Sequence, residues 1–290
     1  METDRSKICG CKGIRTCLKC ECLFDISSKA ICSPDKENSN PYFYCHECRM
    51  CWPGWEGQDH SDHRGEPITL NGIFLLADFL SPEEEEELLK NMDSLPWEVS
   101  QSGRRKQNFG PKCNFKKRKL RIGNFCGFPK VTEFVQEKFK SVGILKDFKT
   151  VEQCSLEYDP LRGASIDPHI DDCWIWGERV VTVNLLSDTV LTLIKYRGDP
   201  NRYNLPYAPP FSKTDLSMDN VLIRIPMIRR SLFVMTGEAR YDWEHQIYRE
   251  DVATRRVCLA YREFTLPYLK GGQHENEGSP ILKAALEFWT

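Results

Sequence analysis

The stretch Asp167-Pro168-His169-Ile170-Asp171-Asp172, near the middle of the 290-residue chain, decides how the fold is interpreted. His169 and Asp171 are two positions apart, so on a β-strand both side chains leave the same face. A histidine nitrogen and a carboxylate oxygen on one face supply two of the three ligands of a 2-His-1-carboxylate iron site. One such triplet alone is more often a solvated strand end. The interpretation therefore depends on a third ligand, a cosubstrate anchor and a suitable fold in the rest of the chain.

Residues after Val151 read as short strands separated by turns, with no amphipathic helix between them. This pattern predicts an all-β jelly roll or sandwich. Residues 197–220, rich in Pro, Asn and Ser, are expected to form a surface loop. The expected strands are 152–158, 166–171, 179–186, 189–195, 221–225, 231–236, 244–248 and 255–264.

A third ligand is expected on one of the later strands. Only His245 and His274 follow His169 in the sequence, and His274 lies in a polar segment rich in Gly and Glu. His245 is flanked by aromatic and aliphatic residues, so a barrel can hold it inside. Taken alone, a histidine in such surroundings is more often part of a core, but His245 is the better candidate for the third ligand.

Arg256 and Arg262 are six residues apart in an otherwise apolar run, so a strand places them on the same face. Facing inward, a guanidinium needs an anionic partner because an unpaired buried charge is very costly. No acidic residue alternates with the two arginines, so the carboxylate of a ligand is the natural counter-ion, and the guanidinium fork fits it. The alternative places both arginines on the solvent face.

The first 65 residues form a separate cysteine-rich segment, because nine of the fourteen cysteines fall within residues 1–51. Cysteines separated by two residues are typical half-sites of structural zinc, and few apolar residues are present to order the segment otherwise. An iron–sulfur cluster and a metal-free tail are the alternatives. We expect zinc on Cys9, Cys11, Cys17 and Cys20, with Cys22, Cys45, Cys48 and Cys51 as alternates.

Residues 66–150 contain helix signals. Ile68 to Phe79 is expected to form a strand. Ser81-Pro82-Glu83-Glu84 is a capping box with proline at the first helical position, so a helix should follow. Residues 131–142 also have helical spacing of apolar positions. At the other end of the chain, residues 280–289 read as an amphipathic helix that packs back on the body.

Residues 104–121 contain nine basic residues and no acidic one, and Phe109 and Phe115 interrupt them. Basic and aromatic residues mixed in a loop or ribbon suit a phosphate-bearing or acidic partner. A solvated hairpin is the equally weighted alternative.

Composition places few limits on function. The net charge of −2 neither favours nor excludes a polyanionic partner. No window approaches ~18 consecutive apolar residues, so no membrane span is expected. Met1 to Lys7 lacks the apolar core of a secretory signal. We therefore expect a cytoplasmic and nuclear protein, in which the cysteines would not form a disulfide framework.

Three motifs resemble, in their order, those of the AlkB-type Fe(II)- and 2-oxoglutarate-dependent dioxygenases. They are His-x-Asp at 169–171, the distal His245 and Arg-x5-Arg at 256–262, and the resemblance covers about residues 68–265. The resemblance implies a double-stranded β-helix whose mouth holds the metal, preceded by a nucleotide-recognition lid that corresponds to residues 104–121. The chain then divides into four parts. They are the cysteine-rich segment at 1–65, an N-terminal extension with the basic lid at 66–150, the catalytic core at 151–265 and a C-terminal helix at 266–290.

The resemblance also implies roles for single residues. His169, Asp171 and His245 would hold Fe(II). Arg256 would pair with the distal carboxylate of 2-oxoglutarate, and Arg262 would lie near its metal-bound end or the substrate. The Asn-x-Tyr motif of the family reads Leu156-Glu157-Tyr158 here, so Tyr158 can still bind the cosubstrate while Leu156 cannot replace the asparagine.

The implied activity is oxidative N-demethylation. The resemblance points to monomethyl-lysine in a protein such as actin, within actomyosin, and to N6-methyladenine in DNA as another substrate. The chain is expected to be monomeric. A non-catalytic zinc-knuckle adaptor with a degenerate β-helix and a protein side-chain hydroxylase are the competing functions. The candidate substrate contacts are Arg104, Arg105, Lys106, Phe109, Phe115 and Trp174.

Overall fold

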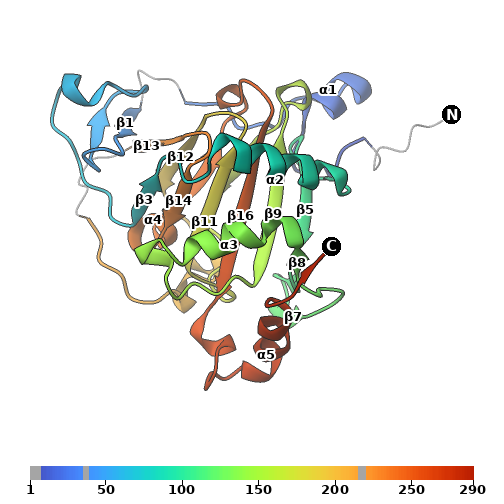
Figure 1. The fold of residues 1–290 in the computed structure, drawn as a ribbon. Coiled ribbons are helices and arrows are strands. Elements are labelled where there is room, and N and C mark those ends of the chain that lie inside the picture. The colour runs from blue at the N-terminus through green and yellow to red at the C-terminus, as the bar shows by residue number, and fades with distance from the viewer. Residues whose placement is uncertain (1–7, 35–38, 215–219) are drawn as a thin grey trace.

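The computed structural model describes residues 8–34, 39–214 and 220–290. Two expectations fall wholly or partly outside these residues: the one drawn from Met1 to Lys7, and the part of the loop expected at 197–220 that comprises residues 215–219. The described chain is built on two β-sheets that enclose a hydrophobic core, with helices against the outer face of the larger sheet (Figure 1).

Eight consecutive strands form the central barrel, with four of them in each sheet. The larger sheet has the order β3-β14-β11-β16-β9-β5-β4, and the smaller sheet has the order β10-β15-β12-β13-β1-β2. This interleaving is a jelly roll of the double-stranded β-helix type, so the expected fold class is confirmed. The eight strands are β9 (Glu152–Tyr158), β10 (Ile166–His169), β11 (Trp176–Leu185), β12 (Thr189–Lys195), β13 (Val221–Met227), β14 (Leu232–Met235), β15 (Trp243–Ile247) and β16 (Arg256–Phe264).

Both faces of the larger sheet are buried, and each strand sends alternate side chains to the two faces. Arg256 on β16 lies directly opposite Tyr158 on β9, so both side chains leave the inner face. The next pair, Val257 and Glu157, leaves the outer face. This alternation separates the residues that line the barrel from those that support the helices.

Short strands from the first half of the chain extend both sheets. In the larger sheet, β3 (Ile73–Leu76) pairs with β14, while β5 (Arg105–Phe109) pairs with β9 and with β4 (Glu98–Val99). In the smaller sheet, β1 (Asn40–Tyr44) pairs in parallel with β13 and antiparallel with β2 (Cys51–Pro53). The segment that precedes the barrel is therefore woven into it.

Helices α2 (Pro82–Ser94) and α3 (Glu133–Phe139) lie across the outer face of the larger sheet (Figure 1). The expected capping box is present, because the Glu84 backbone N–H donates to Ser81 Oγ at 3.1 Å and the Ser81 N–H donates to Glu84 Oε2 at 2.8 Å. Leu88 and Met92 of α2 are fully buried against the sheet. Truncating either one to alanine would cost about 2–5 kcal/mol of stability.

Two sequence expectations about elements need correction. The C-terminal helix α5 spans Glu275–Ala284, and the last residues instead form β17 (Phe288–Trp289), which pairs in parallel with β8 (Phe128–Pro129). Burial of apolar side chains at this pairing outweighs the helical pattern. The strand expected from Ile68 to Phe79 shrinks to β3, because Gly72 turns the chain with φ +90°. A Cβ at Gly72 would lie 1.9 Å from the Thr236 carbonyl oxygen.

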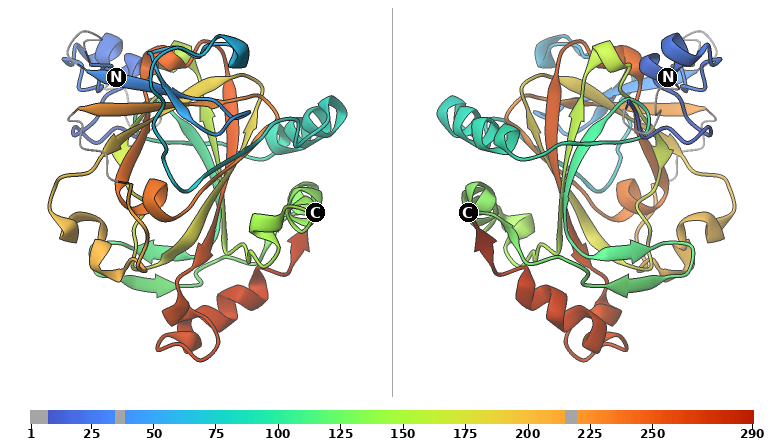
Figure 2. Two further views of the ribbon diagram at one scale, coloured as in Figure 1. Left: turned by 90° about the vertical axis from the view of Figure 1, so that its left-hand side faces the viewer. Right: turned by 90° about the vertical axis from the view of Figure 1, so that its right-hand side faces the viewer.

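The remaining elements are short and connect the larger ones. In the described ranges, no helix is long and apolar enough to cross a membrane. Helix α5 and the cysteine-rich start of the described chain lie at opposite ends of the molecule (Figure 2). The short elements are α1 (Leu18–Phe24), α4 (Gly237–Tyr241), β6 (Lys112–Asn114), β7 (Lys119–Arg121) and the 3-10 turns η3 (His60–Asp62), η4 (Lys130–Thr132), η5 (Gly143–Leu145), η6 (Pro160–Arg162), η7 (Pro200–Tyr203), η8 (Leu205–Tyr207), η9 (Arg249–Asp251) and η10 (Leu266–Tyr268).

Candidate metal and cosubstrate site

His169 and His245 meet across the antiparallel pair of β10 and β15. The two residues are direct partners in the ladder, and their ring centroids are 4.1 Å apart. Burial lowers the pKa of His169, and burial together with the neighbouring His169 lowers the pKa of His245 well below its usual value. Both rings are therefore neutral at pH 7, which is the form that binds a metal. His169 Nδ1 lies 2.8 Å from the Asp167 carbonyl oxygen, so a donating Nδ1 leaves Nε2 as the ligand atom.

Asp171 follows β10, and its two carboxylate oxygens have different surroundings. Its Oδ1 accepts hydrogen bonds from Arg262 Nε at 3.1 Å and Nη2 at 2.9 Å. Its Oδ2 is buried and has no hydrogen-bond partner among the described residues. Burial raises the pKa of Asp171, but Arg262 and the two histidines outweigh it and hold the pKa below its ordinary range. A buried, ionised oxygen without a partner next to two neutral imidazoles fits a divalent metal ion.

The three side chains are near one another but are not drawn together as tightly as a bound metal would hold them. In the described part of the chain, two other groups bring all their potential ligand atoms within 4.8 Å of one another, and this triad is not among them. The donor set itself, two neutral nitrogens and one carboxylate, is the one expected for Fe(II).

Arg256 faces the inside of the barrel, as its spacing predicts, and is 2% exposed. Its Nε donates to Asn184 Oδ1 at 2.6 Å, and its guanidinium carbon lies 4.8 Å from the centroid of the Tyr158 ring. Its Nη1 is buried without a hydrogen-bond partner in the described ranges. A buried guanidinium with an unused donor favours an anionic ligand such as a carboxylate.

Asn184 is a residue that the sequence interpretation did not identify. Its amide nitrogen donates to the backbone oxygens of Ser187 at 2.9 Å and Met227 at 2.8 Å, which leaves its oxygen for Arg256. Leu156, which stands where the family has asparagine, belongs to the same inner face of the sheet and packs against the hydrophobic core. Asn184 therefore orients the arginine from β11, although it does not occupy the position of the missing asparagine.

Arg262 also faces inward but is already paired. Its Nη1 donates to Glu152 Oε2 at 2.6 Å, in addition to its two bonds with Asp171. Burial raises the pKa of Glu152, although Arg262 opposes this effect. Arg262 thus orients Asp171, while Arg256 retains a donor for a ligand.

Arg240 is a second residue that the sequence interpretation left without a role. It is 1% exposed, and its Nε and Nη1 are buried without partners in the described chain. Its charge contributes to lowering the pKa values of Asp171 and His245. Its position before β15, in the same motif as His245, was the only sequence signal.

The basic residues expected to contact substrate separate into different environments. Arg104 is buried and lies 5.9 Å from the Tyr158 ring centroid, so it adjoins the cosubstrate site. Arg105 lies opposite Glu157 on the outer face and binds it through Nη2 at 2.6 Å. This placement contradicts a substrate contact for Arg105, because the sheet separates it from the metal ligands. Lys106 leaves the inner face and lines a cavity of about 800 Å³.

That cavity lies where β5 and β9 meet the hairpin of β6 and β7. Phe115 from the hairpin and Glu152 from β9 line it together with Lys106. Phe109 also lines it, although its ring packs edge-on against Trp289 at 5.8 Å. Glu152 in the wall of this cavity binds Arg262, which in turn binds Asp171.

A second, smaller cavity of about 330 Å³ lies between the hairpin and the loop expected at 197–220, and Phe115, Arg118 and Asp172 line it. Arg118 reaches across to hydrogen-bond Tyr207. Trp174, the remaining aromatic candidate, is 5% exposed and packs against Tyr268 at 5.9 Å. It is a core residue in this structure and not a free wall for substrate.

The expected zinc residues Cys9, Cys11, Cys17 and Cys20 come together in a buried group whose sulfur atoms all lie within 4.8 Å of one another. Tetrahedral zinc with Zn–S bonds of about 2.3 Å separates its sulfur ligands by about 3.8 Å. Cys17 Sγ and Cys20 Sγ are 3.8 Å apart. Of the alternates, Cys22 is exposed and Cys51 is fully buried in the main core. Cys45 and Cys48 join His60 and His63 in a separate group, which the sequence interpretation missed because it considered only cysteines.

The four-cysteine group contacts the turn that carries Arg104 and the strand that carries His169. The Ser102 N–H donates to Cys11 Sγ at 3.2 Å, and the Gly10 N–H donates to the Ser100 oxygen at 3.1 Å. Arg15 forms an ion pair with Asp167, whose carbonyl holds His169. The N-terminal segment therefore supports residues of the candidate site itself.

Comparison with known proteins gives relatives that span nearly the whole chain. The alpha-ketoglutarate-dependent dioxygenase alkB homolog 4 of Homo sapiens is 41% identical over 97% of this chain and 94% of its own length. The DNA N6-methyl adenine demethylase of Caenorhabditis elegans is 30% identical over 95% of this chain and 93% of its own length. The solved structure of OsALKBH1 is a distant likeness, with a TM-score of 0.44 and 10% identity over 66% of this chain and 96% of that chain. No protein-family model matches the chain.

Proposed function

This chain belongs to the AlkB family of alpha-ketoglutarate-dependent dioxygenases, together with alkB homolog 4, and we propose that it demethylates monomethyl-lysine in an acidic protein such as actin. Membership of the family makes it an Fe(II)- and 2-oxoglutarate-dependent oxygenase of the demethylase type.

His169, Asp171 and His245 would hold Fe(II), because they present two neutral nitrogens and a buried carboxylate oxygen without a partner. Arg256, placed by Asn184 and Tyr158, would bind the distal carboxylate of 2-oxoglutarate. When bound, the metal and cosubstrate supply O₂ activation, so that 2-oxoglutarate becomes succinate and CO₂ while the N-methyl carbon is hydroxylated and leaves as formaldehyde.

The residues of the chain prepare this reaction electrostatically. Arg262 keeps Asp171 ionised and oriented, since it donates two hydrogen bonds to one carboxylate oxygen and leaves the other for the metal. Arg240 adds positive charge without a competing contact to Asp171 in the described residues.

The single observation that carries the substrate proposal is the placement of Glu152 and Asp172. Glu152 lines the larger cavity and is linked to Asp171 through Arg262, and Asp172, the next residue after Asp171, lines the smaller one. A methylated lysine carries a positive charge that carboxylates attract. The surrounding hairpin is basic, with exposed Lys112, Lys116 and Lys119, and would favour an acidic protein surface around the target lysine.

N6-methyladenine in DNA is the second candidate. The name of the Caenorhabditis elegans relative and the same basic hairpin support it. A flipped base would need an aromatic face on which to stack. Trp174 is packed into the core and Phe109 is covered by Trp289, so Phe115, 47% exposed on the hairpin, is the remaining candidate from the sequence. This arrangement favours lysine.

The full-length protein should be incubated with Fe(II), 2-oxoglutarate and ascorbate, with monomethyl-lysine actin and N6-methyladenine DNA in parallel. We expect formaldehyde and a loss of 14 mass units (on the order of one methylene) from the actin peptide. Formaldehyde from DNA alone would favour the second candidate. A retained hydroxyl without formaldehyde would indicate a hydroxylase, and no succinate with either substrate would indicate an adaptor.

A further inference from the structure

Cys45, Cys48, His60 and His63 form a compact group outside the candidate active site. Their ligand atoms all lie within 4.8 Å of one another. The two cysteines follow β1 in the turn of the β1–β2 hairpin. His60 is the first residue of the 3-10 turn η3, and His63 directly follows that turn. Two separate pieces of chain thus converge on one point, which we call the Cys2His2 group.

The distances within the group match those between the ligands of one tetrahedral metal ion. Zinc bonds of about 2.3 Å to sulfur and about 2.0–2.1 Å to nitrogen place a sulfur and a nitrogen ligand about 3.6 Å apart. Cys45 Sγ lies 3.7 Å from His60 Nδ1, and Cys48 Sγ lies 4.0 Å from His63 Nδ1. These separations are long for hydrogen bonds but suit two ligands on a shared ion.

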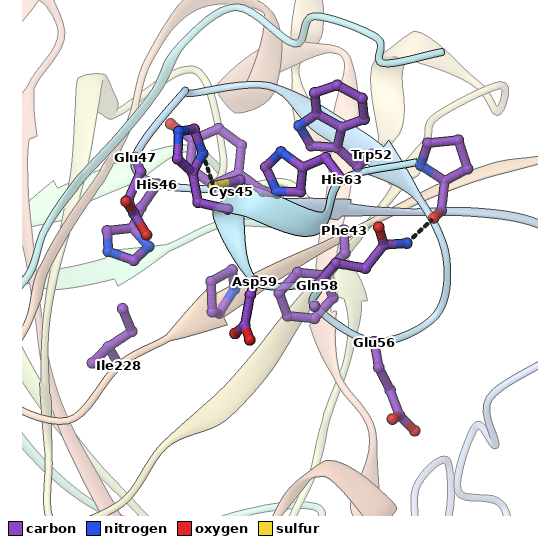
Figure 3. Close-up of a pocket in the computed structure, with 15 residues that line it drawn as sticks. Phe43, Cys45, His46, Glu47, Trp52, Glu56, Gln58, Asp59, His63 and Ile228 are labelled. Atoms are coloured by element: carbon purple, nitrogen blue, oxygen red, sulfur yellow. Dashed lines mark hydrogen bonds between the residues drawn. The ribbon is translucent and has the colours of Figure 1, made fainter. Parts of the chain in front are cut away.

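Neighbouring side chains fix the orientation of these ligands. The Trp52 indole N–H donates to Cys48 Sγ at 3.3 Å, as expected beside a sulfur that carries negative charge. The same indole stacks on the His63 ring, with centroids 4.3 Å apart and planes inclined by 25°. Figure 3 shows Cys45, Trp52 and His63 on one side of the pocket, away from Glu56 and Ile228.

The spacing in the sequence agrees with the geometry. Two residues separate Cys45 from Cys48, and two separate His60 from His63, with a longer run between the pairs. Paired cysteines followed by paired histidines are typical of zinc sites in which four protein ligands fill the coordination sphere. Cys51, the third cysteine of this run, pairs its backbone with Ile68 and lies in the main core, so it is not part of the group.

We propose that the Cys2His2 group binds one zinc ion in a structural site that is separate from both the iron triad and the four-cysteine group. Two thiolates and two imidazoles favour zinc in tetrahedral geometry over Fe(II) or Mg²⁺. Four protein ligands leave no position for substrate, so the ion holds the fold and takes no part in the reaction.

The zinc would fasten the loop after β2 onto the smaller sheet. This loop carries Trp55, whose carbonyl accepts a hydrogen bond from Arg224 Nε at 2.9 Å and whose ring lies 4.1 Å from the Arg224 guanidinium. Arg224 lies on β13 and also binds Asp251 at 2.8 Å. Loss of the ion would therefore loosen β1 and β2 from the barrel edge while leaving the metal ligands of the triad in place.

The test is the zinc content of the full-length protein, measured by mass spectrometry of the metal after extensive dialysis. The double variant His60→Asn with His63→Asn should lose one equivalent of zinc relative to the parent protein. His46→Asn is the matched control, because His46 lines the same pocket but does not belong to the group. The control should keep its full zinc content.

Cobalt substitution provides a measurement that does not depend on a variant that folds. Co(II) in the parent protein should give the absorption of a tetrahedral site with two sulfur and two nitrogen ligands. Equal zinc in the double variant and the parent would overturn the proposal. So would an equal loss of zinc from the His46→Asn control, or Co(II) spectra that report only all-sulfur coordination.

Discussion

Arg262 binds Asp171 through a single carboxylate oxygen, with Nε and Nη2 at 3.1 and 2.9 Å from Oδ1. The other oxygen stays buried and has no partner among the described residues. One half of the carboxylate is thus fixed by the protein, and the other half is available to a ligand. This division explains how a strand end can present an ionised, oriented oxygen inside a barrel.

Asp171→Ala should lower succinate formation by more than about 100-fold, because loss of a partner that only supports a metal ligand already costs about 10- to 100-fold. Near-UV circular dichroism would show whether the fold is retained. Asp147→Ala, at an exposed carboxylate, is the matched control and should keep its activity. Undiminished succinate formation by Asp171→Ala would refute its assignment as a metal ligand.

Arg256→Gln should raise the KM for 2-oxoglutarate by about 10- to 100-fold, since a hydrogen bond between charged groups contributes about 1.5–3 kcal/mol. The kcat should change less. Arg230→Gln serves as the control, because Arg230 pairs with the exposed Asp78. An unchanged KM for Arg256→Gln would show that Arg256 does not bind 2-oxoglutarate. Arg240 would then be the next cation to test.

Replacing Lys112, Lys116 and Lys119 with alanine should raise the KM for the macromolecular substrate about tenfold at low salt, because long-range attraction is lost. The effect should fade as salt screens the remaining charges. Turnover of 2-oxoglutarate without substrate should stay the same. Lys90→Ala, on the exposed side of α2, provides the control.

Glu157→Gln should lower the free energy of unfolding at neutral pH and have little effect in acid, because it removes the titrating carboxylate. Burial raises the pKa of Glu157, but Arg105 and Arg255 outweigh it and lower the pKa below its usual value. The pair therefore stabilises the fold above the unfolded pKa of about 4.3, and this contribution is lost as pH falls through the folded pKa. Denaturant titration should show a cost of about 2 kcal/mol at pH 7 and a shrinking difference in acid.

Cys20→Ser should remove one equivalent of zinc and raise the KM for 2-oxoglutarate severalfold. Cys20 belongs to the group that supports Ser102, and the same turn leads to Arg104 beside Tyr158. Cys22→Ser is the matched control, because Cys22 lies exposed on the same helix. If both variants changed the KM equally, the supporting role of the metal group would be wrong.

The barrel strands could be predicted from the sequence because alternation and turns are local signals. The strand expected at 152–158 and β9 coincide, and the arginine spacing placed Arg256 and Arg262 on the inner face. What the sequence could not give was the partner of each arginine. Arg256 meets Asn184 and Arg262 meets Glu152, and neither pairing has a signature in the sequence, since each depends on strand register.

The errors have different physical origins. Arg105 was grouped with Arg104 as a substrate contact, but adjacent residues on a strand leave opposite faces. The C-terminal helix was extended to Trp289, although pairing of Phe288 with Phe128 ends it earlier. His60 and His63 were overlooked because cysteine spacing was considered without the histidines that complete it.

The pairing of β1 with β13 has a consequence for the order in which the chain folds during synthesis. Glu21 binds Arg249 at 2.9 Å, and Asn40 lies opposite Val221 in the ladder. These partners are distant in sequence and are not synthesised until most of the chain has left the ribosome. The N-terminal segment therefore cannot dock on the barrel before then, and its cysteines stay accessible. Metal binding before docking would protect those thiols during translation. In a nascent chain stalled before Arg249, the N-terminal segment should not yet be docked on the barrel through Glu21.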